Sequence, residues 1–177
     1  DKRTIDVSVV GATGLVGRET LKLLTARDFP VGKLRAFASE RSAGSAMWFG
    51  DEPVSIQALT KESLLAAGPG LVLASAGKEV SAKLREWVKG TDLVVVDNSS
   101  AFRLDPEVPL VVPEVNPGAA ADHNGYIANP NCTTIPLAVV LDAVRAVTDL
   151  AEVSVATYQS VSGAGNKAME ELAAQTM

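Results

Sequence analysis

Residues Ile5-Asp-Val-Ser-Val-Val10 and Gly11-Ala-Thr-Gly-Leu-Val-Gly17, which follow one another without a break, decide the fold of this chain. The first stretch is rich in β-branched side chains and predicts a strand. Apolar residues then recur at roughly helical spacing from Val16 to about Ala26, which predicts a helix. A strand, a glycine-rich turn and a helix in this order form the opening of a βαβ unit.

Strands and helices continue to alternate along the rest of the chain. We expect strands at residues 34–38, 71–74, 93–96, 126–128 and 152–159, and a small hairpin formed by residues 47–49 and 54–56. We expect helices at residues 79–89 and 133–147 and from residue 167 onward. Short strands that alternate with helices are typical of an α/β fold, here a Rossmann-like, doubly wound, mainly parallel sheet with helices on both faces.

The composition excludes several classes of protein. The 177 residues form one domain, or one domain and part of a second, and 47% of them are hydrophobic, so a sizeable core is expected. The net charge of −5 argues against a general binder of nucleic acid or of anionic membranes. A single cysteine excludes an internal disulfide and a cysteine-rich metal cage, and no apolar run approaches the roughly 20 residues of a membrane span. We therefore expect a soluble, cytoplasmic protein without a metal site.

The three glycines of the opening turn have the spacing and the context of a dinucleotide fingerprint. Gly11 permits the tight turn, Gly14 lets backbone N–H groups approach a pyrophosphate at the helix N-terminus, and Gly17 allows close packing of the helix on the strand. An ordinary glycine turn is the alternative, and the flanking strand and helix favour nucleotide binding over it. The candidate cofactor-binding residues of this turn are Gly11, Thr13, Gly14, Leu15, Val16 and Gly17.

The end of the second expected strand indicates which dinucleotide is bound. An NAD site usually places a carboxylate there for the ribose 2′-hydroxyl, whereas an NADP site places arginine and hydroxyl groups there for the 2′-phosphate. The turn reads Ser39-Glu-Arg-Ser42, in which Arg41 can form a bidentate pair with a phosphate and both serines can donate beside it. Glu40 is the contrary signal, and a solvated turn without a ligand is the alternative. Together the arginine and the two serines favour NADP(H).

The only cysteine, Cys132, is the candidate nucleophile. It follows Asn129-Pro-Asn131, a turn that exposes the next residue, and it lies at or just before the start of an expected helix, where the helix macrodipole favours a thiolate. Backbone N–H groups at the same helix start could stabilise a tetrahedral oxyanion. The alternative is a small buried apolar residue. A thiol combined with a nicotinamide cofactor suggests an oxidoreductase that acts on an aldehyde or an acyl phosphate.

Six motifs that appear in order make a more specific pattern than any one of them. They are Gly11-Ala-Thr-Gly-Leu-Val-Gly17, Ser39-Glu-Arg-Ser-Ala-Gly44, Asp97-Asn-Ser-Ser-Ala-Phe-Arg103, Val112-Pro-Glu-Val-Asn-Pro117, Asn129-Pro-Asn-Cys-Thr133 and Tyr158-Gln-Ser-Val-Ser-Gly-Ala-Gly165. Together they resemble the aspartate-β-semialdehyde dehydrogenase family over essentially the whole chain. The related N-acetyl-glutamyl-phosphate reductases typically carry a Gly-Cys pair at the nucleophile. This chain has Asn131-Cys132, which favours the aspartate enzymes.

The resemblance implies a role for each matching residue. Cys132 is the nucleophile that forms a thiohemiacetal or a thioester with the substrate, and Gln159 orients the bound acyl intermediate. Arg103 binds the phosphate or acyl-phosphate group, with Asn131 beside it. A surface position for Arg103 and a water-facing position at a strand edge for Gln159 are the alternatives. The resemblance also assigns Ser39, Arg41 and Ser42 to the 2′-phosphate, and Ser162, Gly163 and Gly165 to a loop close to the nicotinamide.

The implied reaction is the NADP-dependent reductive dephosphorylation of L-4-aspartyl phosphate to L-aspartate 4-semialdehyde, on the route to lysine, methionine and threonine. An N-acetyl-γ-glutamyl-phosphate reductase and a non-catalytic nucleotide-binding paralogue are the alternatives. The implied partners are the small-molecule substrate and phosphate, with no nucleic acid and no membrane.

The resemblance also implies a division of the chain. Residues 1–130 correspond to the NADP-binding domain, and residues 131–177 to the beginning of an α+β domain for substrate binding and dimerisation. Members of the family are longer, so we expect this chain to be their N-terminal half and to be inactive alone. Their catalytic histidine is expected beyond Met177, which makes His123 a solvated residue. At full length the protein is expected to form a homodimer or a homotetramer.

Overall fold

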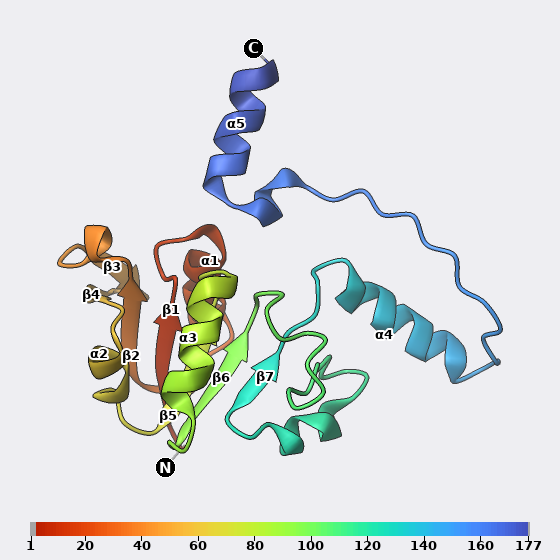
Figure 1. Cartoon of the computed structure of the whole chain (residues 1–177), viewed down its shortest axis with the longest axis horizontal. Coiled ribbons are helices and arrows are strands. Elements are labelled where there is room, and N and C mark those ends of the chain that lie inside the picture. Colours follow the sequence, from red (N-terminus) through yellow and green to blue (C-terminus); the bar gives the residue numbers. More distant parts are fainter. Residues whose placement is uncertain (1–2, 177) are drawn as a thin grey trace.

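The structure is a computed structural model that describes residues 3–176, and within them a seven-stranded sheet forms the centre (Figure 1). In order across the sheet the strands are β3 (Ala46–Phe49), β4 (Glu52–Ala58), β2 (Val31–Ala38), β1 (Ile5–Val10), β5 (Gly70–Ala74), β6 (Leu93–Asp97) and β7 (Tyr126–Ala128). Neighbouring strands are parallel except for the antiparallel pair of β3 and β4. This arrangement confirms the mainly parallel, doubly wound sheet and the small hairpin expected from the sequence.

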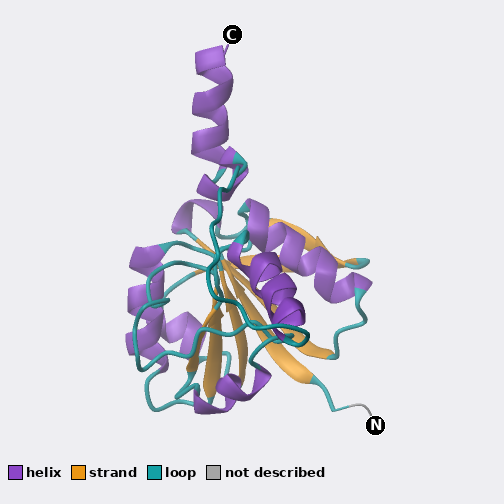
Figure 2. Cartoon of the chain, turned by 90° about the vertical axis from the view of Figure 1, so that its right-hand side faces the viewer, coloured by secondary structure: helices purple, strands orange, loops and turns teal. Residues whose placement is uncertain are grey.

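Helices flank the sheet on both faces (Figure 2). The α-helices are α1 (Leu15–Ala26), α2 (Lys61–Leu65), α3 (Lys78–Val88), α4 (Thr134–Arg145) and α5 (Asn166–Thr176), and short 3₁₀ helices are η1 (Glu40–Ser42), η2 (Pro117–Asp122) and η3 (Val161–Ala164). The longer helices lie where the sequence predicts them. The sequence analysis missed α2, although a capping box marks its start: Ser63 N donates to Thr60 Oγ1 at 3.1 Å and Thr60 N donates to Ser63 Oγ at 3.0 Å. None of the helices described here has the length and apolar character needed to cross a membrane.

The core lies in two layers, one on each face of the sheet. Because successive strand residues point to opposite faces, the two layers share β1 between them. Val7 and Val9 belong to the layer that includes Leu21 of α1, whereas Val10 belongs to the layer that includes Leu84 of α3. All of these side chains are at most 2% exposed, so the two layers hold β1 from both sides.

The strand expected at residues 152–159 is absent, and this expectation was wrong. The segment runs from α4 toward η3 with every residue exposed, and it pairs with no strand among residues 3–176 (Figure 1). Val153 and Val155 alternate as in a strand, yet they are 46% and 50% exposed. Alternation makes a segment compatible with a strand, but a strand also needs a neighbouring strand to bond its N–H and C=O groups.

The sheet has a switch point at β1, which lies between β2 on one side and β5 on the other. In open α/β sheets the crevice at the carboxyl ends of the strands, at such a switch point, is where ligands bind. The turns that follow β1, β5, β6 and β7 all lie along this edge, and η3 and α5 lie beyond it (Figure 1).

Candidate active site

The glycine loop after β1 leaves no room for side chains at two positions. Gly11 has a φ of +79°, and a Cβ placed on it would lie 2.8 Å from the carbonyl oxygen of Ser75. A Cβ on Gly17 would lie 2.2 Å from the carbonyl oxygen of Gly11, so α1 can approach β1 closely only with glycine there. Gly14 is the N-cap of α1 and has no side chain to cap the first turn, so the N–H groups of Leu15 and Val16 are left for a ligand.

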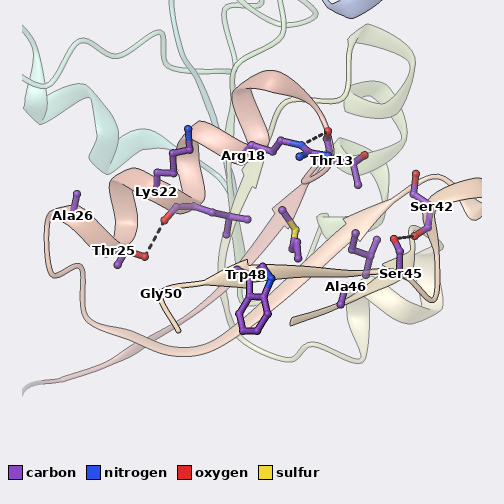
Figure 3. A pocket seen from close by; sticks show the side chains of 13 residues that line it. Thr13, Arg18, Lys22, Thr25, Ala26, Ser42, Ser45, Ala46, Trp48 and Gly50 are labelled. Carbon is purple, nitrogen blue, oxygen red and sulfur yellow. Dashed lines mark hydrogen bonds between the residues drawn. The ribbon is translucent and has the colours of Figure 1, made fainter. Parts of the chain in front are cut away.

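The turn after β2 lies beside this loop, because β2 pairs directly with β1 and the N–H groups of Gly11 and Ala12 both donate to the carbonyl of Phe37. Ser39 and Arg41 are exposed, and Ser42 is half-buried. Ser42 lines a cavity of about 790 Å³ together with Thr13 of the glycine loop (Figure 3). The structure therefore brings the glycine loop and part of the 2′-phosphate turn to one cavity.

A second cavity, of about 320 Å³, lies at the carboxyl ends of β5 and β6. Four candidate residues from distant parts of the sequence line it: Val16, Arg103, Asn131 and Gly163. Lys78, at the start of α3, lines it as well, and no carboxylate of the described part of the chain does. Two cations without a counter-charge make this cavity suitable for an anion such as a phosphate group.

Arg103 is held in place by backbone carbonyls. Its Nε donates to the carbonyl oxygen of Asn129 at 2.9 Å and its Nη2 donates to that of Asn98 at 3.0 Å. These two carbonyls follow the ends of β7 and β6, so the guanidinium bridges two neighbouring strand ends. The remaining N–H groups of the guanidinium are left to bind an anion in the cavity.

A buried network of hydrogen bonds at the end of β6 holds the segment that carries Arg103 in the wall of the second cavity. Asp97 is fully buried, and its carboxylate accepts hydrogen bonds from Ser81 Oγ at 3.0 Å and from the N–H and hydroxyl of Ser99 at 2.8 Å each. The Tyr126 hydroxyl lies 3.1 Å from the same carboxylate. Burial, together with the charge of Asp97, raises the pKa of Tyr126 well above its usual range, so the hydroxyl remains a donor.

Outside this network, Arg85 of α3 holds the loop of residues 102–107 in place. Its guanidinium pairs with Asp105 and with Glu107, the latter at 3.0 Å, and it lies 4.7 Å from the ring centre of Phe102. The backbone N–H of Glu107 and the hydrogen bond from Arg85 hold the pKa of Asp105 below its ordinary value. The loop that contains Arg103 is therefore fastened both before and after that residue.

Cys132 is exposed and lies just before the N-cap of α4, Thr133. It does not line the second cavity, but its neighbour Asn131 does. The Nδ2 group of Asn131 donates to Gln159 Oε1 at 3.4 Å, which places Gln159 beside the cysteine segment. The N–H groups of Thr133 and Thr134 donate to Asn131, so these two are not available for the expected oxyanion site.

His123 lies at the opposite end of β7 from Cys132, because it precedes the strand whereas the cysteine follows it. Its Nδ1 accepts a hydrogen bond from the N–H of Gly125 at 2.8 Å, and the residue is half-buried rather than fully solvated. It lines a different cavity, together with Arg85 and Tyr126. This placement excludes a Cys132–His123 pair in the structure.

The family model described as "Semialdehyde dehydrogenase, NAD binding domain" matches residues 6–123. This chain belongs to the semialdehyde dehydrogenase family. A second model, described as the semialdehyde dehydrogenase dimerisation domain, matches residues 141–177. These matches confirm the resemblance inferred from the six motifs.

Relatives of this semialdehyde dehydrogenase chain carry a more specific name. Two proteins named aspartate-semialdehyde dehydrogenase are similar to it: that of Prochlorococcus marinus is 49% identical over 96% of this chain, and that of Synechocystis sp. is 50% identical over 97%. The crystal structure of aspartate semialdehyde dehydrogenase II from Vibrio cholerae, complexed with ASA, matches 99% of this chain with a TM-score of 0.89 and 41% identity. This chain spans about half the length of these relatives, covering 49%, 50% and 52% of them respectively.

Sequence reasoning found only part of the second cavity in this member of the family. It missed six lining residues, all of which follow the ends of β5 and β6: Ser75, Gly77, Lys78, Asn98, Ser99 and Ser100. The rule that ligands bind beyond the carboxyl ends of parallel strands could have indicated them. No local motif marks Lys78, and only the fold brings it opposite Arg103.

Proposed function

We propose that this chain forms the cofactor-binding and nucleophile-bearing part of an NADP-dependent aspartate-semialdehyde dehydrogenase. The reaction is the reversible reductive dephosphorylation of L-4-aspartyl phosphate to L-aspartate 4-semialdehyde. The observation that carries the proposal is the cavity that brings the helix of the glycine loop together with Arg103, Lys78 and Asn131, next to the exposed Cys132. The relatives that bear this name over almost the whole chain support it.

The residues present fit a bound dinucleotide. The space that side chains on Gly11 and Gly17 would fill is taken by backbone, and the uncapped first turn of α1 offers N–H groups to a pyrophosphate. A bound NADPH supplies the hydride of the reaction. In this proposal Ser162, Gly163 and Gly165 lie close to the nicotinamide end, which is supported by the position of Gly163 on the second cavity.

For the adenosine end, Ser39, Arg41 and Ser42 are proposed to bind the 2′-phosphate. The arginine and the two hydroxyls suit a phosphate dianion, whereas Glu40 in the same turn opposes it by repulsion. The preference for NADP over NAD therefore depends on whether enough positive charge meets the 2′-phosphate to outweigh Glu40.

The chemistry proposed for Cys132 takes place in two stages. The thiolate attacks the acyl carbon of the aspartyl phosphate, a C–S bond forms, the bond from that carbon to the phosphate oxygen breaks, and inorganic phosphate leaves toward Arg103. Addition of a hydride to the thioester carbon and of a proton to its oxygen gives a thiohemiacetal on Cys132. Loss of the hydroxyl proton and cleavage of the C–S bond then release the semialdehyde and restore the thiolate.

Asn131 and Gln159 are proposed to hold the acyl group beside the sulfur. Both are neutral amides that can orient a carbonyl without competing as nucleophiles. The proton of the thiohemiacetal needs an acceptor, and the only histidine of the chain, His123, lies at the other end of β7 from the cysteine. We propose that this base is a histidine in a part of the protein that corresponds to the other half of the relatives, which this chain does not span.

The proposal also includes the assembly and the setting of the protein. Residues 1–130 are proposed to form the NADP-binding domain and residues 131–177 the beginning of the substrate domain. The match of residues 141–177 to a dimerisation-domain model supports a homodimer or a homotetramer. The reaction belongs to the route to lysine, methionine and threonine, in the cytoplasm.

The deciding experiment measures phosphate-dependent NADPH formation from L-aspartate 4-semialdehyde. We expect activity from the full-length protein, loss of that activity in Cys132→Ala, and no activity from residues 1–177 alone. N-acetyl-glutamate 5-semialdehyde serves as the competing substrate, and a preference for it would identify the related reductase instead. Tight NADPH binding without turnover of either semialdehyde would indicate a non-catalytic paralogue.

A further inference from the structure

The larger cavity, beside α1, has a chemistry that the glycine loop and the 2′-phosphate turn do not fully explain (Figure 3). Arg18 and Lys22 of α1 line one wall, and Ser42, Ser45 and Trp48 line the opposite wall. Although the chain has a net charge of −5, none of the carboxylates among residues 3–176 lines this cavity. A site of this kind, with cations, hydroxyl groups and an indole at its rim, suits an anionic ligand.

Arg18 is the better placed of the two cations. Its Nε donates to the carbonyl oxygen of Thr13 at 3.0 Å, which holds the guanidinium against the glycine loop and leaves the terminal N–H groups free of that bond (Figure 3). Lys22 lies one helical turn farther from the loop, about 6 Å along the helix axis. Its ammonium pairs with Glu19 at 3.3 Å, which offsets part of its charge.

Ser42 is on the facing wall of the same cavity. Its carbonyl accepts the hydroxyl of Ser45 at 2.7 Å, which holds the turn in place, and the residue itself is half-buried. An anion between the two walls would meet the Ser42 hydroxyl from one side and the Arg18 guanidinium from the other. Because Ser42 belongs to the turn proposed for the 2′-phosphate, that phosphate is the anion which geometry and charge favour.

We propose that Arg18 is a specificity-determining residue that selects NADP over NAD by binding the 2′-phosphate from the α1 side of the cavity. This proposal rests on the function proposed above. Arg18 would then be a second guanidinium, in addition to that of Arg41, whose attraction for the 2′-phosphate outweighs the repulsion of that phosphate by Glu40. Arg18 is the fourth residue of α1, outside the turn after β2 that usually binds a 2′-phosphate.

The test uses Trp48, which is 69% exposed at the rim of the cavity, as a fluorescent reporter of binding to the chain. The probes are adenosine 2′,5′-bisphosphate and adenosine 5′-monophosphate, which differ only in the 2′-phosphate. Removing a charge-assisted hydrogen bond at a partly solvated site corresponds to about a tenfold change in affinity. We expect Arg18→Gln to weaken binding of the bisphosphate about tenfold and to leave that of the monophosphate unchanged, with partial rescue in Arg18→Lys.

Arg27→Gln is the matched control, because it removes the same charge from the C-cap of α1, a residue that does not line this cavity. If Arg18→Gln weakens the binding of both probes equally, Arg18 only supports the glycine loop through its bond to Thr13. That result would overturn the proposal. If Arg41→Gln weakens bisphosphate binding selectively while Arg18→Gln does not, the proposal for Arg18 fails and the NADP site stands. If the unmodified chain binds neither probe, the proposed cofactor site fails as well.

Discussion

Residues 5–128 and residues 132–176 contain comparable apolar segments but use them differently. Within residues 3–176, the buried hydrophobic side chains of the core all lie between Val7 and Ala128. In contrast, α4 and α5 bury none of their residues, although α4 includes the apolar stretch from Ile135 to Leu141. Helices form through bonds within their own backbone, whereas burial requires a second element to pack against. Apolar composition therefore predicts that a segment can be buried, not that it is.

The same contrast divides the candidate active site. The glycine loop, the 2′-phosphate turn and Arg103 belong to the packed region, where Arg103 is held by two backbone carbonyls and by the network around Asp97. Gln159 belongs to the exposed region, and its bond to Asn131 measures 3.4 Å, which is long for a hydrogen bond. The anion site is rigidly built, and the position of Gln159 depends on weaker contacts.

The sharpest test of this comparison replaces a leucine in a helix of each region. Leu84 of α3 is fully buried, and Leu84→Ala should lower the free energy of unfolding by about 2–5 kcal/mol because it leaves a cavity. Leu172 of α5 is 47% exposed, and Leu172→Ala should change it by no more than about 0.5 kcal/mol. Urea unfolding followed by circular dichroism measures both. Equal losses would show that α5 is part of the same packed unit.

Substitutions of two glycines should give the next largest difference in the free energy of unfolding. In Gly17→Ala the new methyl group meets backbone 2.2 Å away, so we expect a loss of about 1–3 kcal/mol in the free energy of unfolding, together with weaker NADP binding as α1 moves. No atom of the described residues lies within 4 Å of a Cβ on Gly163, so the free energy of unfolding of Gly163→Ala should be within about 0.5 kcal/mol of that of the unmodified chain. Urea midpoints and a nucleotide titration check the pair. A neutral Gly17→Ala would contradict the close helix–strand contact.

The two tyrosines of the chain sharpen the comparison for hydrogen bonding. Tyr126→Phe removes a donor from the buried Asp97 carboxylate and should cost about 1–3 kcal/mol of unfolding free energy. Tyr158 is 98% exposed, so Tyr158→Phe should have no measurable effect. Thermal melts of both variants at neutral pH distinguish the two expectations. A larger loss from Tyr158→Phe than from Tyr126→Phe would overturn the account of the network.

The smallest effect is a pH dependence within the packed region. The pKa of Asp105 is lowered in the folded chain by the N–H of Glu107 and by Arg85, so the charged carboxylate stabilises the fold above its unfolded pKa. That stabilisation is lost as pH falls below the ordinary value of 3.8 and through the lowered folded pKa. Urea midpoints measured between neutral pH and pH 3 should fall less steeply in Asp105→Asn. Identical slopes would remove Asp105 from the acid response.

The sequence by itself determined the elements whose signals are local. The alternation of strands and helices, the glycines of the loop after β1 and the helix start next to Cys132 all follow from patterns a few residues long, and the structure has each of them. Local patterns succeed here because backbone geometry and steric limits act within one or two turns.

Tertiary structure alone decided which segments pair with, or pack against, distant parts of the chain. Residues 152–159 alternate like a strand but meet no neighbouring strand, whereas Lys78 and Arg103, 25 positions apart by their numbers, come to line one cavity. Asp97 accepts bonds from its neighbour Ser99, but its remaining bonds form because Ser81 and Tyr126 reach it from α3 and β7. Pairing, burial and the gathering of charges depend on contacts between distant segments, and no short pattern in the sequence encodes those contacts.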